Sequence, residues 1–132
     1  MIMSTEFELI YPDECYRISG AVFDVYREIG CGFLEAVYQD CLGRELKRQG
    51  IPFESQKVFR LHYRGELIHP AYVADFLCYE KIIVELKAVA EIAPIHKAQV
   101  LNYLKMSRLK LGLLVNFGHY PKATVDRIPN LR

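Results

Sequence analysis

The sequence of 132 residues contains no apolar run that approaches the length of about 20 residues needed for a transmembrane helix, so a membrane protein is not expected. The first eleven residues carry two glutamates and lack a basic segment followed by an apolar stretch, so a secretory signal is not expected either. Repeats, low-complexity tracts and linkers are also missing. With 52% hydrophobic and 25% charged residues, the chain is predicted to form one folded domain over residues 1–132, with residues 1–12 as an N-terminal extension.

Cysteine pairs with the spacing of zinc or redox motifs are absent as well. The four cysteines are Cys15, Cys31, Cys41 and Cys78, and no two of them form a C-x-x-C pair. Cys15 and Cys41 fall where predicted helices would bury a small apolar side chain. The pattern favours reduced structural thiols in a cytoplasmic protein.

The net charge of +1 conceals an asymmetry along the chain. Residues 1–80 contain 8 Lys/Arg and 13 Asp/Glu, whereas residues 81–132 contain 9 Lys/Arg and 3 Asp/Glu. A basic second half suits a surface that faces a polyanion. Ordinary solvated charge is the alternative, because halves of a sequence need not be halves of a molecule.

Hydrophobic spacing predicts three helices. The first is expected from Asp13, as its cap, to about Ile29, and the second from about Leu34 to Gln49. Pro94 is well placed as the first residue of a third helix that ends near Ser107. The residues expected to face the core are Ile18, Val22, Val25 and Ile29 in the first helix, and Leu34, Val37, Cys41, Leu42 and Leu46 in the second.

The remaining pattern predicts strands. These are expected over Lys57–Tyr63, Tyr72–Cys78, Ile82–Val89 and Leu109–Phe117, with Val125–Ile128 as an edge strand. Residues 64–66 read as a turn, and residues 79–81 as a hairpin loop. The strand over 109–117 is nearly all apolar, which is typical of a strand covered on both faces. The order of elements predicts an α/β domain with a mixed sheet.

Charged residues interrupt the apolar run over residues 82–89 at Glu85 and Lys87. An ionised side chain in such a run is costly unless it is paired or holds a metal. A loop centred on Glu80 would place Asp75 opposite Glu85, with the two Cβ atoms about 5 Å apart. Lys87 would share their face of the sheet. Two carboxylates this close favour a cation between them, and oxygen ligands suit Mg²⁺ or Mn²⁺. A solvated ion-pair face on a half-exposed hairpin is an equally open alternative.

Two further groups of residues accompany this hairpin. In the third helix, His96, Gln99 and Tyr103 recur at spacings of three and four residues and share one face, where they could hold a phosphate or form an ordinary polar stripe. Glu35 lies in the first turn of the second helix, where the helix dipole alone explains a carboxylate. Its spacing from Tyr38 beside the apolar stripe is not explained by capping.

Taken together, these residues resemble a known family. The motifs Gly32-x-x-Glu35-x-x-Tyr38, Asp75, Glu85-Leu86-Lys87 and Gln99-x-x-x-Tyr103 resemble the small bacterial GxxExxY family, which is grouped with the PD-(D/E)XK nuclease superfamily. The resemblance runs from about residue 16 to residue 128. It implies a restriction-endonuclease-like core (αβββαβ) with a mixed central sheet flanked by helices. The proline that precedes the first aspartate in the superfamily is replaced here by Ala74.

The resemblance also implies the roles of single residues. Asp75, Glu85 and the main-chain carbonyl of Leu86 would bind a divalent metal, with Glu35 completing the acidic cluster. Lys87 would be the catalytic lysine. The residues expected at the nucleic acid are Gln99 and Tyr103, together with His96 and Lys97, while Gly32 and Tyr38 are motif residues with a structural role.

The function favoured by the sequence is a metal-dependent nuclease. It would hydrolyse phosphodiester bonds of nucleic acid, expected to be DNA, using Mg²⁺ or Mn²⁺ and the catalytic residues Glu35, Asp75, Glu85 and Lys87. The alternative is a catalytically inactive module of nuclease fold that binds nucleic acid or a protein partner. A homodimer is compatible with either function.

Overall fold

The computed structural model describes residues 9–131. Residues 1–8, which make up most of the predicted N-terminal extension (residues 1–12) and of the segment tested for a secretory signal, therefore lie outside the described residues, whereas Pro12 of that extension is the first residue of α2. The helices are α2 (Pro12–Ile29), α3 (Glu35–Arg48) and α4 (Pro94–Ser107). The strands are β1 (Phe53–Phe59), β2 (His62–Tyr63), β3 (Glu66–Leu67), β4 (Tyr72–Cys78), β5 (Ile82–Lys87), β6 (Leu111–Asn116) and β7 (Thr124–Pro129).

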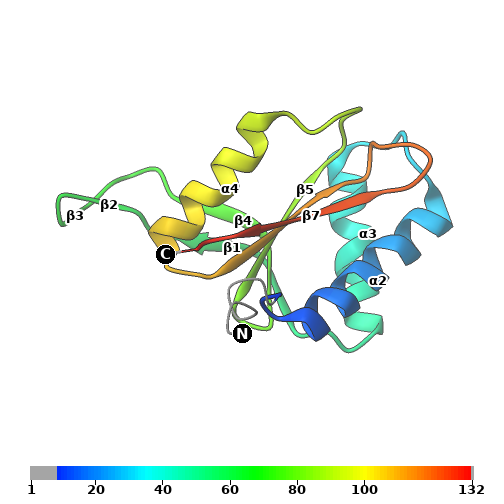
Figure 1. Ribbon diagram of the computed structural model, residues 1–132, viewed down its shortest axis with the longest axis horizontal. Helices are drawn as coiled ribbons and strands as arrows, with labels where there is room; N and C mark the ends of the chain where they lie inside the picture. Colours follow the sequence, from blue (N-terminus) through cyan, green and yellow to red (C-terminus); the bar gives the residue numbers. More distant parts are fainter. Residues whose placement is uncertain (1–8, 132) are drawn as a thin grey trace, which may run out of the picture.

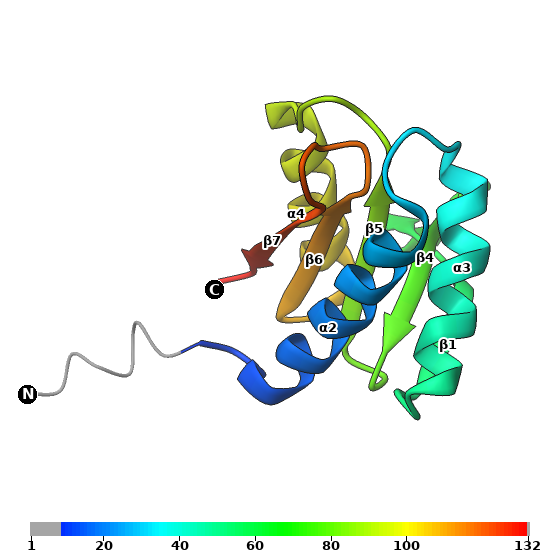
Figure 2. The same cartoon turned by 90° about the vertical axis from the view of Figure 1, so that its right-hand side faces the viewer.

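A five-stranded mixed sheet forms the centre of the molecule. Its strand order is β1-β4-β5-β6-β7, as Figure 2 shows from the side of α2 and α3. The β5–β6 pair is parallel and the other three pairs are antiparallel. Helix α4 makes the crossover between the two parallel strands, which is the usual connection for such a pair. The predicted mixed α/β architecture is confirmed.

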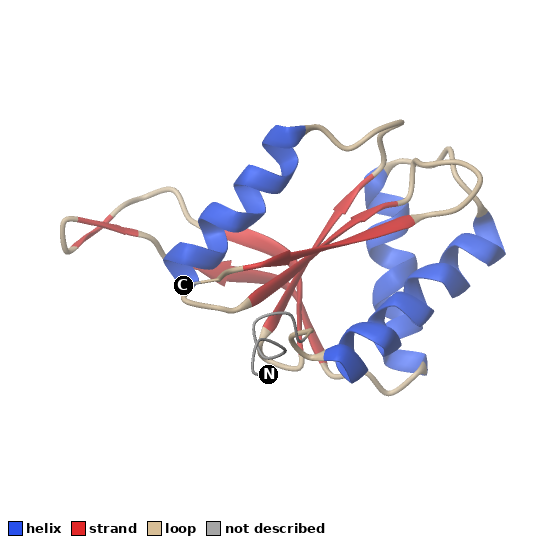
Figure 3. Cartoon of the chain, viewed as in Figure 1, coloured by secondary structure: helices blue, strands red, loops and turns tan. Residues whose placement is uncertain are grey.

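The helices cover opposite faces of the sheet. Helices α2 and α3 lie on one face and α4 on the other, while β2 and β3 form a separate hairpin that projects beyond α4 (Figures 1 and 3). Between residues 9 and 131, no helix is long and apolar enough to cross a membrane.

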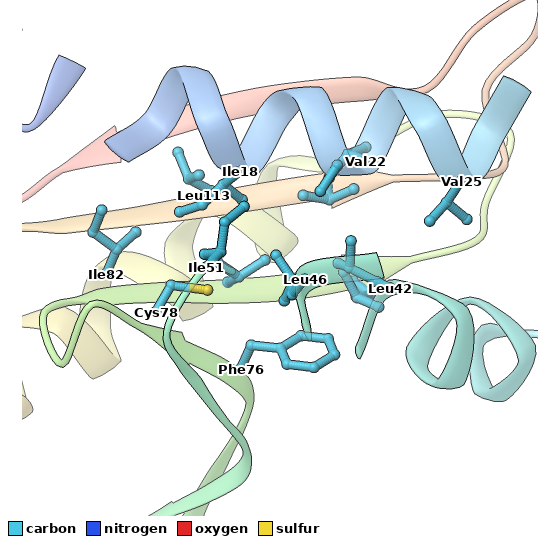
Figure 4. Close-up of a cluster of buried hydrophobic side chains, with 14 of the residues drawn as sticks. Ile18, Val22, Val25, Leu42, Leu46, Ile51, Phe76, Cys78, Ile82 and Leu113 are labelled. Atoms are coloured by element: carbon cyan, nitrogen blue, oxygen red, sulfur yellow. The ribbon is translucent and has the colours of Figure 1, made fainter. Parts of the chain in front are cut away.

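Each face has its own buried cluster. The α2/α3 core contains Ile18, Val22, Val25, Leu42 and Leu46 from the helices and Phe76, Cys78, Ile82, Val84, Leu86, Leu111, Leu113 and Val115 from the sheet; Figure 4 shows much of it. The α4 core contains Tyr72, Ala74, Leu77, Ile83, Val100, Leu104, Leu114 and Ile128. Every residue of β6 is buried, as predicted for a strand covered on both faces. Gly112 allows α4 to approach β6, because a Cβ there would lie 2.7 Å from Val100 Cγ1.

Two helix predictions need correction. Asp13 is not the cap of α2, because the helix begins at Pro12 and Tyr11 is its N-cap. Proline is favoured at the first helical position, and Asp13 then contributes to the first turn, where the dipole favours an acid. Leu34 was expected in the core but is 77% exposed, because as the N-cap of α3 it has extended backbone and lies outside the helix. Helix α4 has the predicted bounds.

The strand predicted over residues 57–63 is also wrong in its bounds. β1 begins at Phe53 and ends at Phe59, after which the chain leaves the sheet and forms the β2–β3 hairpin. The predicted turn lies at its tip, where Arg64 and Gly65 both have positive φ, 51° and 82°, as a two-residue type I′ turn requires. All four cysteines are free, as expected, although Cys41 is only half-buried.

Candidate active site

The β4–β5 hairpin brings the charged residues together. Its loop has Tyr79 and Glu80 in the left-handed region, with φ of 57° and 59°. The ladder pairs Cys78 with Ile82, Leu77 with Ile83, and Phe76 with Val84. This is the predicted register, and its continuation places Asp75 opposite Glu85. The β4–β5 ladder ends at the Phe76–Val84 pair, so Asp75 and Glu85 are not bridged to each other, although Glu85 still pairs with Leu114 of β6.

Side-chain alternation changes face at Asp75. Tyr72 belongs to the α4 core, whereas Phe76, four residues later, belongs to the α2/α3 core. The neighbouring strand changes in the same place, because Phe53 packs in the α2/α3 core and Phe59 against the α4 core. The register puts Gln56 opposite Asp75, without a bridge between them and with a φ of 54° at Gln56. Such backbone is costly for a residue other than glycine, and it concentrates at functional sites.

The main-chain carbonyl and the carboxylate of Asp75 accept hydrogen bonds from outside the regular β-ladder. Gln39 Nε2, on α3, donates to the Asp75 carbonyl oxygen at 3.1 Å. The Leu86 N–H donates to Asp75 Oδ2 at 2.7 Å. Burial raises the pKa of the Asp75 carboxyl, and the Leu86 N–H, the positive charge of Lys87 and the Gln56 side chain partly oppose that rise.

Glu85 is the more strongly perturbed carboxyl. Burial is the main reason that its pKa rises to about 7; Lys87 and the backbone N–H of Asp75 lower it, and the negative charge of Glu35 raises it. The Tyr72 hydroxyl also donates a short hydrogen bond to Glu85 Oε2. Asp75 and Glu85 are thus linked in both directions, because the Asp75 N–H supports the Glu85 carboxylate and the Leu86 N–H supports the Asp75 carboxylate.

A small pocket lies between this hairpin and α4. Its volume is about 70 Å³, and it is lined by Tyr72, Glu85, Lys87, His96, Gln99, Val100, Tyr103 and Leu114. The Tyr72 and Tyr103 rings stack with centroids 3.7 Å apart. His96 Nδ1 accepts the Ala93 N–H at 3.0 Å, so the proton of the neutral ring is on Nε2. The pocket therefore combines a carboxylate, an ammonium, an amide and an imidazole N–H.

Six predicted site residues lie outside this pocket, namely Glu35, Asp75, Leu86 and Lys97 and the motif residues Gly32 and Tyr38. Asp75 is not among the lining residues; its backbone N–H supports Glu85, which lines the pocket, and its carboxylate accepts the Leu86 N–H. Lys97 is exposed and lies 4.0 Å from Asp126 of β7. Glu35, the first residue of α3, is exposed and acts on Glu85 through its charge. Among residues 9–131 no three acidic, histidine or cysteine side chains converge on one point, so a ready-formed three-carboxylate cluster is not present there.

Tyr38 and Gly32 shape the loop that precedes Glu35. The Tyr38 hydroxyl donates to the Gly30 carbonyl at 2.6 Å and accepts the Phe33 N–H at 3.3 Å. Its fully buried ring stacks on Phe117 with centroids 4.4 Å apart. Gly32 has a φ of 108°, which side chains rarely allow. These contacts fix the start of α3 and with it the position of Glu35.

Sequence reasoning missed three residues that contact the acids. In the sequence Tyr72 looks like an ordinary core aromatic residue of a strand, and only its hydrogen bond to Glu85 in the structure shows that it supports the site. Gln39 lies four residues after Glu35 on the same face of α3, a spacing that could have drawn attention to it. Gln56 gave no signal, because glutamine is not typical of left-handed backbone.

The donor set fits a hard divalent cation. Two partly buried carboxylates are joined by main-chain hydrogen bonds, and the pKa of each is raised because its negative charge lacks solvent. A bound cation would offset that cost, and oxygen donors suit Mg²⁺ or Mn²⁺.

Comparisons with known proteins identify the family. A sequence model described as the PD-(D/E)XK nuclease superfamily matches residues 12–128. No curated protein matches the chain. Three chains of solved structures match, and one of them, the crystal structure of SSO0001, has a TM-score of 0.57 and 18% identity over 74% of this chain. The match covers 50% of that protein's length, and a likeness at this identity concerns the fold alone. The mixed sheet with its flanking helices is the restriction-endonuclease-like fold, and the chain belongs to the PD-(D/E)XK nuclease superfamily.

Proposed function

We propose that the protein is a metal-dependent nuclease that hydrolyses phosphodiester bonds of DNA. The observation that supports this best is the pair Asp75 and Glu85, two carboxyls of raised pKa joined through each other's main chain and next to Lys87. In an ion pair with only a structural role, the lysine would contact a single carboxylate that is exposed to solvent. Here both acids are partly buried, and Lys87 reduces the pKa of each.

The metal would be held by Asp75, Glu85 and the Leu86 carbonyl, with Glu35 as the further carboxylate. A divalent ion bound there would polarise a phosphate oxygen and promote ionisation of a water molecule. Lys87 Nζ would donate to a non-bridging phosphate oxygen and stabilise the negative charge that develops during cleavage. Tyr72 holds Glu85, and Gln39 holds the main chain of Asp75, so neither acid needs to reorient.

Residues of α4 would bind the phosphate on the other side of the pocket. Gln99 and the Nε2–H of His96 present donors, and Tyr103 fixes Tyr72 by stacking. Lys97, outside the pocket, would contact a neighbouring phosphate. The motifs Gly32-x-x-Glu35-x-x-Tyr38 and Gln99-x-x-x-Tyr103 place the chain, in our proposal, in the GxxExxY branch of the superfamily.

Cleavage by matched variants tests this function. Purified protein is incubated with plasmid and single-stranded DNA in Mg²⁺ or Mn²⁺. We expect Asp75→Asn and Lys87→Met to reduce the rate at least about a hundredfold, since each removes charge that acts in the transition state. Asp40→Asn and Lys47→Met make the same chemical changes at exposed positions of α3 and should cleave as wild type does. Equal rates for the site and control variants would refute the proposal.

The second candidate is an inactive nuclease-fold module that binds nucleic acid. It is favoured by one observation, that no three metal-binding side chains converge within residues 9–131. A wild-type protein that binds DNA, cleaves none of the substrates, and shows no heat of Mg²⁺ binding in calorimetry would establish this reading in place of the first.

A further inference from the structure

The β2–β3 hairpin is the part of the molecule that projects furthest from its body. We call residues 60–69 the ribbon. Residues 62–67, which contain both of its strands and its turn, are exposed throughout, and Figures 1 and 3 show it extending beyond α4, on the side away from α2 and α3. A short ribbon with its whole tip in water contributes little to the core. Its well-formed turn, with positive φ at Arg64 and Gly65, therefore calls for another explanation.

The charge of the ribbon opposes the charge of the surrounding sequence. It contains Arg60, Arg64, two histidines and a single acid, Glu66. The rest of residues 1–80 contains 6 Lys/Arg and 12 Asp/Glu. Helix α4, which flanks the same side of the sheet, carries Lys97 and Lys105 and no acid. The lysines of α4 and the arginines of the ribbon thus belong to elements on the same side of the molecule, which suits a polyanionic partner.

The tip of the ribbon combines an aromatic ring with a cation. Tyr63 is 64% exposed, and the Arg64 guanidinium carbon lies 5.6 Å from the centre of its ring. Arg64 Nε also donates to the Tyr63 hydroxyl at 3.2 Å. The two side chains support one another in water and leave polar edges free. Arginine and tyrosine side chains are both among those that contact phosphate and sugar oxygens in protein–DNA complexes.

The base of the ribbon is fixed beside the candidate active site. The Ile68 N–H donates to the Leu61 carbonyl at 3.0 Å, and Leu61 packs against the α4 core. Phe59 stacks on Tyr72, whose hydroxyl binds Glu85. The chain therefore passes from the ribbon to the candidate metal site within a few residues.

We propose that the ribbon is a DNA-binding arm that enters the major groove of a duplex while the phosphate to be cleaved lies at Glu85 and Lys87. A two-stranded ribbon fits the width of that groove. Arg60 contacts the phosphate backbone from the base, and Arg64 with Tyr63 contacts the groove at the tip. This inference rests on the proposed nuclease function and makes double-stranded DNA the substrate.

Binding to a fluorescent duplex in EDTA tests the arm without cleavage. The variant Arg60→Gln/Arg64→Gln is compared with Arg44→Gln/Arg48→Gln, which removes the same charge from exposed positions of α3 across the sheet. We expect the ribbon variant to weaken binding at least about tenfold and to reduce the slope of log K against log salt by about one, because Arg60 is the arginine that contacts a phosphate. The α3 variant should change neither quantity. Tyr63→Ala should weaken binding without changing the salt slope.

Three results would overturn the proposal that the ribbon is a DNA-binding arm. One is equal affinity for the ribbon and α3 variants. Another is unchanged affinity together with loss of a dimer in light scattering, which would make the ribbon an interface between copies of the chain. The third is equal loss of affinity for duplex and single strand, which would exclude insertion into a groove. Cleavage by Asp75→Asn separates the two proposals, because an Asp75→Asn variant that cleaves as wild type does refutes the proposed catalytic site and leaves the loss of duplex binding in the ribbon variant intact.

Discussion

Asp75 owes its position to groups that other strand residues do not use. Its carbonyl accepts a hydrogen bond from Gln39 on α3, and its carboxylate accepts the Leu86 N–H. The residue that faces it on β1 is Gln56, whose backbone is left-handed. An aspartate in a regular ladder would have its main chain fixed by the sheet and its side chain directed to one face. At Asp75 the ladders to both neighbouring strands are interrupted, and the acid is held by donors from outside those ladders.

Gln39 is therefore expected to matter for activity beyond its contribution to stability. Gln39→Met keeps the length of the side chain but removes the donor to the Asp75 carbonyl. We expect a lower rate at saturating substrate, a higher Mg²⁺ concentration for half-maximal cleavage, and a loss of unfolding free energy of about 1 kcal/mol.

Gln49→Met is the matched control for that change. The Gln49 amide joins Asp24 and Glu45, at the end of α3 remote from Asp75. Its loss should cost a similar free energy of unfolding and leave cleavage unchanged. If both variants lose activity in proportion to their stability, Gln39 is a structural residue only.

The contact between α4 and β6 is the element-scale feature on which the pocket depends. Gly112 leaves room for Val100, and the same turn of α4 carries Gln99 and Tyr103 into the pocket. Val100 is a stiff, branched side chain and cannot avoid an added methyl group at 2.7 Å by a rotamer change. The distance of α4 from the sheet is thus set by a residue that has no chemistry of its own.

Gly112→Ala should displace α4 outward. We expect a loss of unfolding free energy of about 1–3 kcal/mol, typical of overpacking, and reduced cleavage because Tyr103 no longer supports Tyr72. Gly20→Ala, on α2 with nothing within 4 Å of the new methyl group, should instead stabilise the protein by up to about 1 kcal/mol. Thermal denaturation of both variants measures the difference, and a stable Gly112→Ala would contradict the packing argument.

The stability of the whole molecule should depend on pH through Glu85. Its pKa is about 7 in the fold, compared with 4.5 for an ordinary glutamate, so the native state binds an additional proton between these values. The free energy of unfolding therefore falls as the pH rises from about 4.5 to 7, by an amount on the order of 3 kcal/mol. Below this range the stabilising contribution is complete, and above it the contribution is lost.

Melting temperatures measured in EDTA at a series of pH values check this expectation. Glu85→Gln should remove most of the fall in stability, whereas Glu28→Gln, at an exposed position of α2, should not alter it. Added Mg²⁺ should stabilise wild type more at pH 8 than at pH 6, since protons compete for the same carboxylate. A pH dependence that is identical in wild type and Glu85→Gln would exclude Glu85 as its source.

Short-range signals explain which parts of the molecule were predictable from sequence. The β4–β5 register follows from a tight loop, and the start of α4 follows from Pro94, because both depend on neighbouring residues. The exposed position of Leu34 and the separation of the ribbon from β1 depend on where the chain leaves an element, which hydrophobic spacing does not encode.

The parts of the site that sequence did not reveal are contacts across the fold. Tyr72 meets Glu85 because alternation changes face at Asp75, and that change requires facing irregularities in two strands at once. Gln39 reaches Asp75 from a different layer. Glu85, Lys87, Gln99 and Tyr103, which the sequence singled out by their residue types, do line one pocket, and their roles in catalysis stay a prediction. Their supporting residues are of types that are common in any core or surface.

Because the β4–β5 ladder is interrupted, backbone amides beside the acids can report the ionisation of those acids. The Leu86 N–H is bonded to the Asp75 carboxylate, and the Asp75 N–H supports the Glu85 carboxylate, so the magnetic environment of these amide protons follows the ionisation of those acids. Two cross-peaks in an amide spectrum thus record the state of the centre directly, without substrate, label or turnover.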